Sequence, residues 1–205
     1  AVTNQIIFSE NGKDWQIAVE SPEITPRYNH KAVVFKDRIW VVGGFDADEN
    51  GLDDVWSSED GINRKREVSV SDFRGRGVHG LHVLNDRIYM IGGMRNSWDN
   101  GSSEVWSSED GISWERDSYL GFSQRRMFGS TVASGVLWVF GGAGREGELN
   151  DLYYSSDGIK WNKAECNYVV SKRRGSVILG DENRLWLSGG AVSYTHLTLP
   201  TIYSV

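Results

Sequence analysis

The sequence predicts an all-β fold built from repeated four-stranded units. A short apolar segment that closes with two glycines occurs four times along the 205 residues. The first glycines of these pairs are Gly43, Gly92, Gly141 and Gly189, with spacings of 49, 49 and 48 residues. A fixed period of this length is typical of propellers and solenoids. The chain also has 24 glycines, 9 Trp, 8 Tyr and 7 Phe, which favours many short strands joined by tight turns.

A second motif lies between the glycine pairs and predicts a hairpin in each repeat. Apolar residues and one or two serines lead into Asp-Gly or Asn-Gly, and the copies cover residues 6–12, 55–61, 105–111 and 152–158. Asp-Gly or Asn-Gly between two strand-like runs indicates a tight turn, because that turn requires a positive φ. Trp15, Trp114 and Trp161 each follow a turn glycine by three residues, whereas Arg64 takes this place in the second copy.

Each period therefore holds four predicted strands, a to d. Strand a is expected at residues 31–35, 80–84, 130–133 and 176–179. Strand b is the segment before the glycine pair, strand c leads into the Asp-Gly turn, and strand d carries the tryptophan that follows. Because no segment of ten or more residues shows a 3.6-residue apolar period, we expect almost no helix.

Counting the strands predicts an arc of about four blades in an incomplete ring. Residues 1–191 are expected to form this fragment, with a c–d half-blade at 5–19, full blades at 28–68, 77–118 and 127–166, and an a–b half-blade at 171–190. A closed ring usually takes more than four blades, so we expect the arc to be cut at both ends.

The last segment breaks the repeat abruptly. Val192 to Thr201 are the residues that a transposase-type sequencing adapter would encode, and a variable index would give the three residues that follow. We therefore expect residues 192–205 to be a non-native tail and leave them out of the fold argument.

Composition and charge exclude several classes of function. With 24% charged and 39% hydrophobic residues the chain is ordinary for a globular protein. A net charge of −6 argues against a general nucleic-acid binder, and no apolar run approaches the 18 residues of a membrane span. Cys166 is the only cysteine, so no internal disulfide or cysteine-based zinc site is expected. The cellular location is left open, a periplasmic or extracellular one included, because the sequence starts inside a repeat without an initiator Met.

The combined pattern resembles kelch repeats over residues 6–190. In such repeats an acidic and an apolar residue lead into strand c, here Asp54-Val55, Glu104-Val105 and Asp151-Leu152. The entry into strand a is also similar to kelch repeats, with Arg27 and His30 recurring as Arg76 and His79. Phe128 stands at the third His position, and the fourth entry, residues 172–174, has no unique alignment. The resemblance implies a kelch-type β-propeller of four-stranded antiparallel blades whose b–c and d–a loops share one face.

A second resemblance concerns only the turn. Residues 108–114 resemble the Asp-box turn of sialidase propellers. No sialidase-like active-site motif accompanies this turn, so we interpret it as turn chemistry.

The aromatic residues divide into repeated and non-repeated positions. Eight of the nine tryptophans recur with the repeat and are predicted to pack between blades: Trp15, Trp40, Trp56, Trp106, Trp114, Trp138, Trp161 and Trp186. Trp98 is the exception, on the predicted b–c loop at 94–103. It is a ligand-binding candidate that could stack on a sugar or a protein partner; the alternative is that it packs on its own loop.

Arginines are predicted to gather on the same face. Arg27, Arg76, Arg125 and Arg126, with Arg173 or Arg174, would form a ring suited to carboxylates or acidic peptides. The alternative is that a repeated arginine bonds neighbouring loop carbonyls in every blade. His82, at a strand-a position that is Val33 one blade earlier, is a further candidate that could face the central channel.

One loop resembles the start of a calcium-binding loop. Asp46, Asp48 and Asn50 have the spacing of the first ligands, but the closing Glu is absent because Ser57 stands at the twelfth position. The alternative is a solvated acidic loop. No other metal site and no cofactor are predicted.

The first functional hypothesis is a non-catalytic module that binds a protein or a glycan through its b–c and d–a loops. The alternative is a carbohydrate-active enzyme, because kelch propellers include enzymes resembling N-acetylneuraminate epimerase/mutarotase and copper galactose oxidases. The copper enzymes would need a Tyr–Cys pair and histidine ligands, and only Cys166 beside Asn167-Tyr168 offers part of this set. A third alternative is an architectural segment of a larger surface protein. The spacing shows no nucleophile–base pair and no phosphate loop.

Overall fold

The computed structural model describes residues 2–20, 22–96, 99–119, 121–167 and 170–192. These ranges form sixteen β-strands and no helix. The predicted all-β fold of four-stranded antiparallel sheets is confirmed. The expectation that residues 192–205 are a non-native tail stays a prediction, because nearly all of that segment lies outside the described residues.

Three full sheets follow one another along the chain. The first full sheet has β3 (Lys31–Phe35), β4 (Arg38–Val42), β5 (Val55–Ser58) and β6 (Lys65–Val68). The second has β7 (Gly80–Leu84), β8 (Arg87–Ile91), β9 (Glu104–Ser108) and β10 (Glu115–Tyr119). The third has β11 (Gly129–Ala133), β12 (Val136–Gly144), β13 (Gly147–Ser155) and β14 (Asn162–Lys163).

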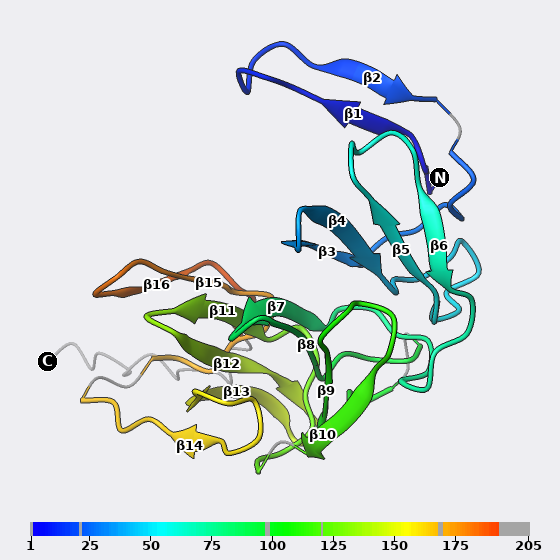
Figure 1. Ribbon diagram of the computed structural model, residues 1–205. Coiled ribbons are helices and arrows are strands. Elements are labelled where there is room, and N and C mark those ends of the chain that lie inside the picture. The colour runs from blue at the N-terminus through cyan, green and yellow to red at the C-terminus, as the bar shows by residue number, and fades with distance from the viewer. Residues whose placement is uncertain (1, 21, 97–98, 120, 168–169, 193–205) are drawn as a thin grey trace, which may run out of the picture.

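Two half-sheets flank the full sheets. The N-terminal hairpin pairs β1 (Ile6–Phe8) with β2 (Gln16–Val19), and the C-terminal hairpin pairs β15 (Val177–Gly180) with β16 (Leu185–Ser188). The five sheets follow an arc, with the two hairpins at its opposite ends (Figure 1). Contacts between β3 and β7, β7 and β11, and β11 and β15 place the first strand of each sheet nearest the centre of the arc.

The glycine pair ends the second strand where the chain turns closely over its neighbours. Gly43 and Gly44 have φ values of 61° and 102°, which a residue with a side chain rarely adopts. A Cβ on Gly44 would also lie 2.9 Å from the carbonyl oxygen of Tyr28. The third sheet differs, because β12 continues to Gly144 and pairs with β13 from Gly147 onward. Its connection is thus a β-hairpin rather than an irregular loop.

The Asp-Gly turns close the hairpin between the third and fourth strands. In the second full sheet, the Asp110 carboxylate accepts hydrogen bonds from the backbone N–H groups of Ile112 and Ser113 at 2.8 and 2.7 Å. The Ser108 hydroxyl accepts from the Gly111 N–H at 2.8 Å, and Gly111 has a φ of 78°. The pattern recurs at Asp60 and Asp157. These serines and aspartates therefore hold the turn by local hydrogen bonds.

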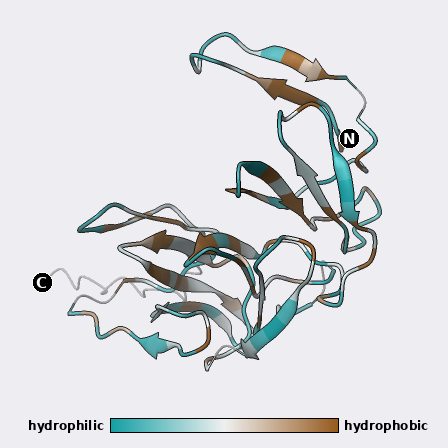
Figure 2. Ribbon diagram, viewed as in Figure 1, coloured by the Kyte–Doolittle hydropathy of each residue, from teal (hydrophilic) through white to brown (hydrophobic). Residues whose placement is uncertain are grey.

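The core lies between adjacent sheets rather than within one. Between the first and second full sheets, Trp40 and Val42 pack with Met90, Trp106 and Trp114. The fourth strands β6, β10 and β14 are hydrophilic and lie on the outside of the arc, as Figure 2 shows. Apolar side chains thus fill the gaps between sheets, as is typical of stacked repeats that cannot bury both faces alone.

Two tryptophans differ from the packing prediction. Trp40, Trp56 and their equivalents in the second full sheet are buried, but Trp15 and Trp186 are 60% and 55% exposed. The reason is their position: both belong to the half-sheets at the ends of the arc, where no further described sheet covers them.

Candidate functional site

The candidate functional surface is the loop face. We define this face as the end of the sheets that carries the connections after each second strand and before each first strand. Isolated bridges join these connections in pairs, such as Tyr28 with Phe45 and Arg126 with Ala143. The two kinds of loop therefore lie side by side, as the resemblance implied.

A buried arginine lies beneath the loop face at the entry to each full sheet. Arg27, Arg76 and Arg125 are 7%, 1% and 0% exposed. Each donates to the carbonyl oxygen of the first glycine of its pair, at 2.8 to 3.0 Å. We call these three residues the entry arginines.

The entry arginines also pair with the acidic residue that leads into the third strand. Arg27 binds Asp54 through two nitrogens at 2.7 and 2.8 Å, and Arg125 binds Asp151 at 2.6 and 3.0 Å. Arg76 pairs with Glu104 at 2.6 Å. The guanidinium donors are thus hydrogen-bonded inside the protein. Of the two roles that the sequence left open, binding a ligand or bonding neighbouring loops, this favours the second.

The ion pairs keep their carboxylates charged. Burial alone would raise the pKa of Glu104, but the hydrogen bond and charge of Arg76 outweigh it, so the pKa lies below its usual value. The pKa of Asp54 is lowered in the same way by Arg27, with a further hydrogen bond from the Trp56 indole at 2.7 Å. A buried charge pair that is fully hydrogen-bonded fixes the local geometry, and removal of one partner leaves an uncompensated charge.

The remaining predicted arginines lie closer to the surface. Arg173 takes the entry position of the C-terminal hairpin, because it donates to the carbonyl of Gly189 at 3.0 Å. No acidic partner is recorded for Arg173 among the described residues. Arg126 is half-buried and donates to the carbonyl of Asp99 at 2.6 Å, which ties two neighbouring loops together.

The histidines lie near the inner strands. His82 is half-buried and shares a hydrogen bond of 2.8 Å with the Ser130 hydroxyl, so it bridges the second and third full sheets. Burial, with a smaller effect of Lys31, lowers the pKa of His82 to about 4. His79 is 1% exposed, and neither ring nitrogen has a hydrogen-bond partner. Burial and the Arg76 charge lower the pKa of His79 to about 3, so it is neutral at physiological pH.

The proposed calcium loop is closed by its own hydrogen bonds. The Asp46 carboxylate accepts from the backbone N–H groups of Asp48 and Asn50, each at 2.9 Å, and from the Asn50 side chain at 3.1 Å. These bonds from Asn50 lower the pKa of Asp46. In the part of the chain that the structure describes, no group of three or more His, Cys, Asp and Glu side chains converges as metal ligands would. The Asp46 carboxylate is thus hydrogen-bonded within its own loop, and the calcium site stays a prediction.

Above the buried layer, the exposed side chains differ from sheet to sheet. The first full sheet presents Asp48 and Glu49, the second presents Arg95, and the third presents Arg145 and Glu146 at the hairpin tip. Trp98, the aromatic candidate on this face, lies outside the described residues. The loop face therefore combines a repeated interior with a non-repeating surface.

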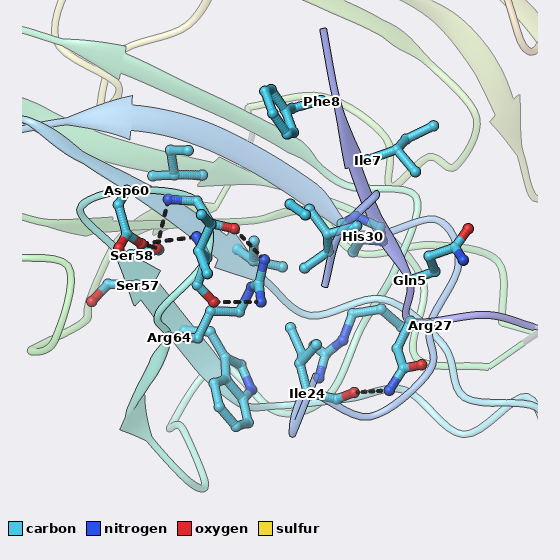
Figure 3. Close-up of a pocket in the computed structure, with 18 of the residues that line it drawn as sticks. Gln5, Ile7, Phe8, Ile24, Arg27, His30, Ser57, Ser58, Asp60 and Arg64 are labelled. Carbon is cyan, nitrogen blue, oxygen red and sulfur yellow. Dashed lines mark hydrogen bonds between the residues drawn. The ribbon is translucent and has the colours of Figure 1, made fainter. Parts of the chain in front are cut away.

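A cavity of about 460 Å³ lies between the N-terminal hairpin and the first full sheet, and it reaches Arg27 and His30 in the connection before β3. Figure 3 shows Ile7 and Phe8 of β1 on one side and Ile24, Ser58 and Arg64 on the other. The lining combines apolar side chains of both sheets with the charged residues Arg27, Asp60 and Arg64.

The cavity coincides with the departure of Arg64 from the tryptophan pattern. Trp114 and Trp161 each donate an indole hydrogen bond of 3.1 Å to the carbonyl of their turn glycine. Arg64 donates to the equivalent carbonyl, that of Gly61, so a guanidinium replaces the indole. Trp114 also packs edge-on against Phe73, with ring centroids 5.4 Å apart, whereas Ile24 takes the Phe73 position here.

The pairing of entry arginines with acids was not foreseen from the sequence. The arginine and the acid are 26 to 28 residues apart, and each belongs to a different part of the repeat. Their nearly constant separation in three repeats is the signal that would have linked them.

No described helix is long and apolar enough to cross a bilayer.

Comparison with known proteins agrees with this architecture. The Kelch motif model matches residues 26–57, which hold the first entry arginine, the first glycine pair and the start of the next strand. Beta-scruin of Limulus polyphemus is 26% identical over 181 residues, which are 81% of this chain and 19% of beta-scruin. Residues 26–57 thus carry a Kelch motif, and the positions that it covers recur in the other sheets of the chain.

The chain is also similar to a second curated protein and to a solved structure. A tRNA wybutosine-synthesizing protein 2/3/4 of Oryza sativa subsp. japonica is 32% identical over 75 residues, 36% of this chain and 7% of that protein. The chain thus spans less than a fifth of the length of both curated relatives. The structure of YjhT superposes with a TM-score of 0.72 at 16% identity and covers 87% of this chain and 63% of YjhT. At that identity the likeness supports the propeller fold alone.

Proposed function

We propose that this kelch-repeat chain is a binding module whose loop face holds a protein or glycan ligand. The observation that carries the proposal is the division of this face into two layers. The entry arginines are buried, their acids are buried or half-buried, and the pairs repeat in every full sheet, whereas the exposed residues above them do not repeat. Variable side chains on loops held by a rigid scaffold are the usual arrangement of a recognition surface.

The third full sheet offers the most rigid part of this surface. β12 and β13 are paired up to Gly144 and Gly147, so Arg145 and Glu146 are held at the tip of a hydrogen-bonded hairpin. Both tip residues are exposed. A side chain presented by a preorganised hairpin loses little entropy on binding, which favours affinity.

A charge-reversal pair tests the proposal. Arg145 precedes β13 on the loop face, and Lys160 follows β13 at the opposite face; both are exposed. The wild-type chain, Arg145→Glu and Lys160→Glu are passed over an array of neutral, sialylated and sulfated glycans and of acidic and basic peptides. We expect at least one probe class to bind, and Arg145→Glu to change its affinity about tenfold or more while Lys160→Glu changes it less than about twofold.

Two results would contradict the proposal. Equal effects of the two variants would mean that binding does not use the loop face, and a chain that binds no probe class would remove the support for a ligand site there. The enzyme alternative is tested on the same preparation. NMR-monitored anomer exchange of N-acetylneuraminate above the uncatalysed rate would favour a sugar enzyme, and exchange at the uncatalysed rate would remove it.

A further inference from the structure

Three arginines gather around one carboxylate at the start of β9, in the second full sheet. The entry arginine Arg76 pairs with Glu104 at 2.6 Å. Arg95 and Arg116 lie beside the same carboxylate, with nitrogen–oxygen distances of 3.8 and 3.6 Å. In the first and third full sheets the equivalent acid pairs, among the described residues, with its entry arginine alone. The second full sheet therefore carries more positive charge at this place than its neighbours do.

The guanidinium groups of Arg95 and Arg116 are open to a ligand. Both distances to Glu104 are longer than a hydrogen bond, and among the described residues neither guanidinium group donates one. Their side chains are 42% and 46% exposed, against 1% for Arg76. Arg76, in contrast, donates to Glu104 and to the carbonyl oxygen of Gly92. Because arginine has five N–H donors and stays charged, both exposed groups can pair with a further anion.

A second acid near the cluster is bound within its own loop. The Asp99 carboxylate accepts from the backbone N–H groups of Arg95 and Gly101 at 3.3 and 3.1 Å. Three arginines thus face two carboxylates, Glu104 and Asp99, which leaves one positive charge in excess. Burial lowers the pKa of Arg76, Glu104 raises it, and the charge of Arg95 lowers it again. Glu104 therefore does not cancel the charge of Arg95.

Arg116 is held between two aromatic rings. It lies opposite Trp106 in the pairing of β9 with β10, and Tyr119 lies opposite Glu104. The guanidinium carbon of Arg116 is 4.9 Å from the centre of the Tyr119 ring and 5.9 Å from that of Trp106. Trp106 is buried, whereas Tyr119 is 58% exposed. An arginine held over aromatic rings loses less conformational freedom on binding, and the ring of Tyr119 adds an apolar surface beside it.

The cluster belongs to the non-repeating layer of the loop face. Two residues after the glycine pair, the place of Arg95 is taken by Asp46 in the first full sheet and by Gly144 in the third. Ser69 takes the place of Tyr119 in the first full sheet. The four-stranded sheet forms in all three cases, so the fold does not require this combination of residues.

We propose that Arg95, Arg116 and Tyr119 bind an acidic sugar residue of a glycan. A carboxylate or sulfate group of the sugar pairs with the two guanidinium groups, and the apolar face of the sugar packs against the Tyr119 ring. The exposed ring beside the cations favours a sugar over an acidic peptide, whose carboxylates are carried on flexible side chains. The inference rests on the proposed function, because it names the ligand class of the same loop face.

Isothermal titration calorimetry of the full chain with four probes tests the ligand class. A heparin oligosaccharide carries sulfates, an oligomer of galacturonic acid carries carboxylates, a maltose oligomer is neutral, and a glutamate oligopeptide carries carboxylates without a sugar. At least one acidic oligosaccharide should bind about tenfold or more tightly than the neutral oligomer and the peptide, since hydrogen bonds to charged groups are strong. Added salt should weaken this binding.

Variants of the second full sheet test the site. Arg95→Gln and Arg116→Gln should each weaken binding of the acidic oligosaccharide about tenfold or more. Arg116→Lys should weaken it less than Arg116→Gln, because lysine keeps the charge but not the planar fork. Tyr119→Ser should weaken it about threefold. The matched control is Arg66→Gln: Arg66 is exposed, lies over Trp56 at 5.8 Å at the equivalent place of the first full sheet, and should change binding less than about twofold.

Several results would overturn the inference. A glutamate oligopeptide that binds as tightly as the acidic oligosaccharides would assign the cluster to acidic peptides, and equal effects of Arg116→Gln and Arg66→Gln would remove the site. Urea unfolding confirms that each variant is folded, and Arg116→Lys keeps the test valid if Arg116→Gln is not. Binding that Arg145→Glu weakens, but Arg95→Gln and Arg116→Gln do not, would sink this inference and leave the proposed function standing. Absence of binding to any probe class would remove both.

Discussion

The contact between the first and second full sheets and the contact at the N-terminal hairpin use the same repeat positions with different results. In the first contact, Trp40 covers Gly111 and Trp114 packs on Phe73, so the space is filled. In the second contact, Arg64 replaces the tryptophan and the strand that would cover Gly61 is not among the described residues, so a cavity of about 460 Å³ is left. The difference shows that the side chain at a given position of the repeat stabilises this fold only when the neighbouring sheet supplies a side chain against which it packs.

The largest effect should come from the packed tryptophan. Trp114→Ala should lower the free energy of unfolding by about 3–5 kcal/mol, because it removes a buried ring from the filled contact. Trp15→Ala, at the equivalent position of the N-terminal hairpin, should change it by less than about 0.5 kcal/mol, since Trp15 is 60% exposed. Urea unfolding in dilute solution measures both. Similar losses of unfolding free energy in the two variants would contradict the difference between the filled contact and the N-terminal hairpin.

A smaller loss is expected from an entry arginine. Arg76→Gln should cost about 3 kcal/mol, because it leaves the half-buried Glu104 without its main partner. The loss should stay near the lower end of the range for such pairs, since Arg95 and Arg116 lie within 4 Å of Glu104. Arg173→Gln removes an exposed side chain that binds carbonyls but no acid, and should cost under about 1 kcal/mol. Calorimetric or urea unfolding of the two variants that gave the reverse order would refute the assignment of the entry arginines.

The next prediction concerns pH. The pKa of His79 in the folded chain is about 3, below its ordinary value of about 6.5, so the unfolded chain binds more protons between these values. Stability from the neutral His79 is therefore fully present above pH 6.5 and is lost as the pH falls toward 3. Between pH 8 and pH 5 the loss should be about 2 kcal/mol.

The variant that checks this is already present in the repeat. Phe128 holds the His79 position in the third full sheet. His79 lies beside Gly43 and Gly93, and Phe128 lies in the same way beside Gly92 and Gly142. His79→Phe should therefore fold at neutral pH, and it should reduce the loss of unfolding free energy between pH 8 and pH 5 by about 2 kcal/mol. His30→Phe, at an exposed equivalent position, is the matched control and should have a smaller effect. An unchanged pH slope in His79→Phe would show that His79 is not the titrating group.

The smallest effect is expected from filling the cavity at the N-terminal hairpin. The double change Ile24→Phe and Arg64→Trp restores the aromatic pair that Phe73 and Trp114 form in the next sheet. It should raise the free energy of unfolding by about 1 kcal/mol through partial filling of the cavity. The single change Arg64→Trp should give less than the double change, because its ring would lack the edge-on partner. A destabilised double variant, measured by urea unfolding, would mean that Arg64 is required where it stands.

Much of the fold followed from the sequence because its determinants are local. The glycine pairs end strands by positive φ angles, and the Asp-Gly turns close hairpins by hydrogen bonds within six residues, so both features are visible in short segments. The continuation of β12 to Gly144 was not visible, because glycines near a turn also suit an irregular loop. Backbone pairing between β12 and β13 decides that case.

The candidate site was less predictable because its determinants are not local. The arginines were located on the correct face, but whether they point to a ligand or to the interior depends on Asp54, Glu104 and Asp151, which are 26 to 28 residues away. The exposure of Trp15 and Trp186 depends on which sheets flank them, and a repeat pattern is the same at the end of an arc as in its middle. Local patterns therefore specified the sheets, and contacts between sheets specified the site.

Hydrogen–deuterium exchange of the chain in dilute solution tests the central claim most directly. The account predicts that the amides of β1 and β16, which pair with one strand each among the described residues, exchange much faster than those of β8, which pairs with a strand on both edges. If β1 and β16 are as protected as β8, a strand of this fold does not depend on its neighbouring strand and sheet for stability, and the comparison between the two contacts is wrong.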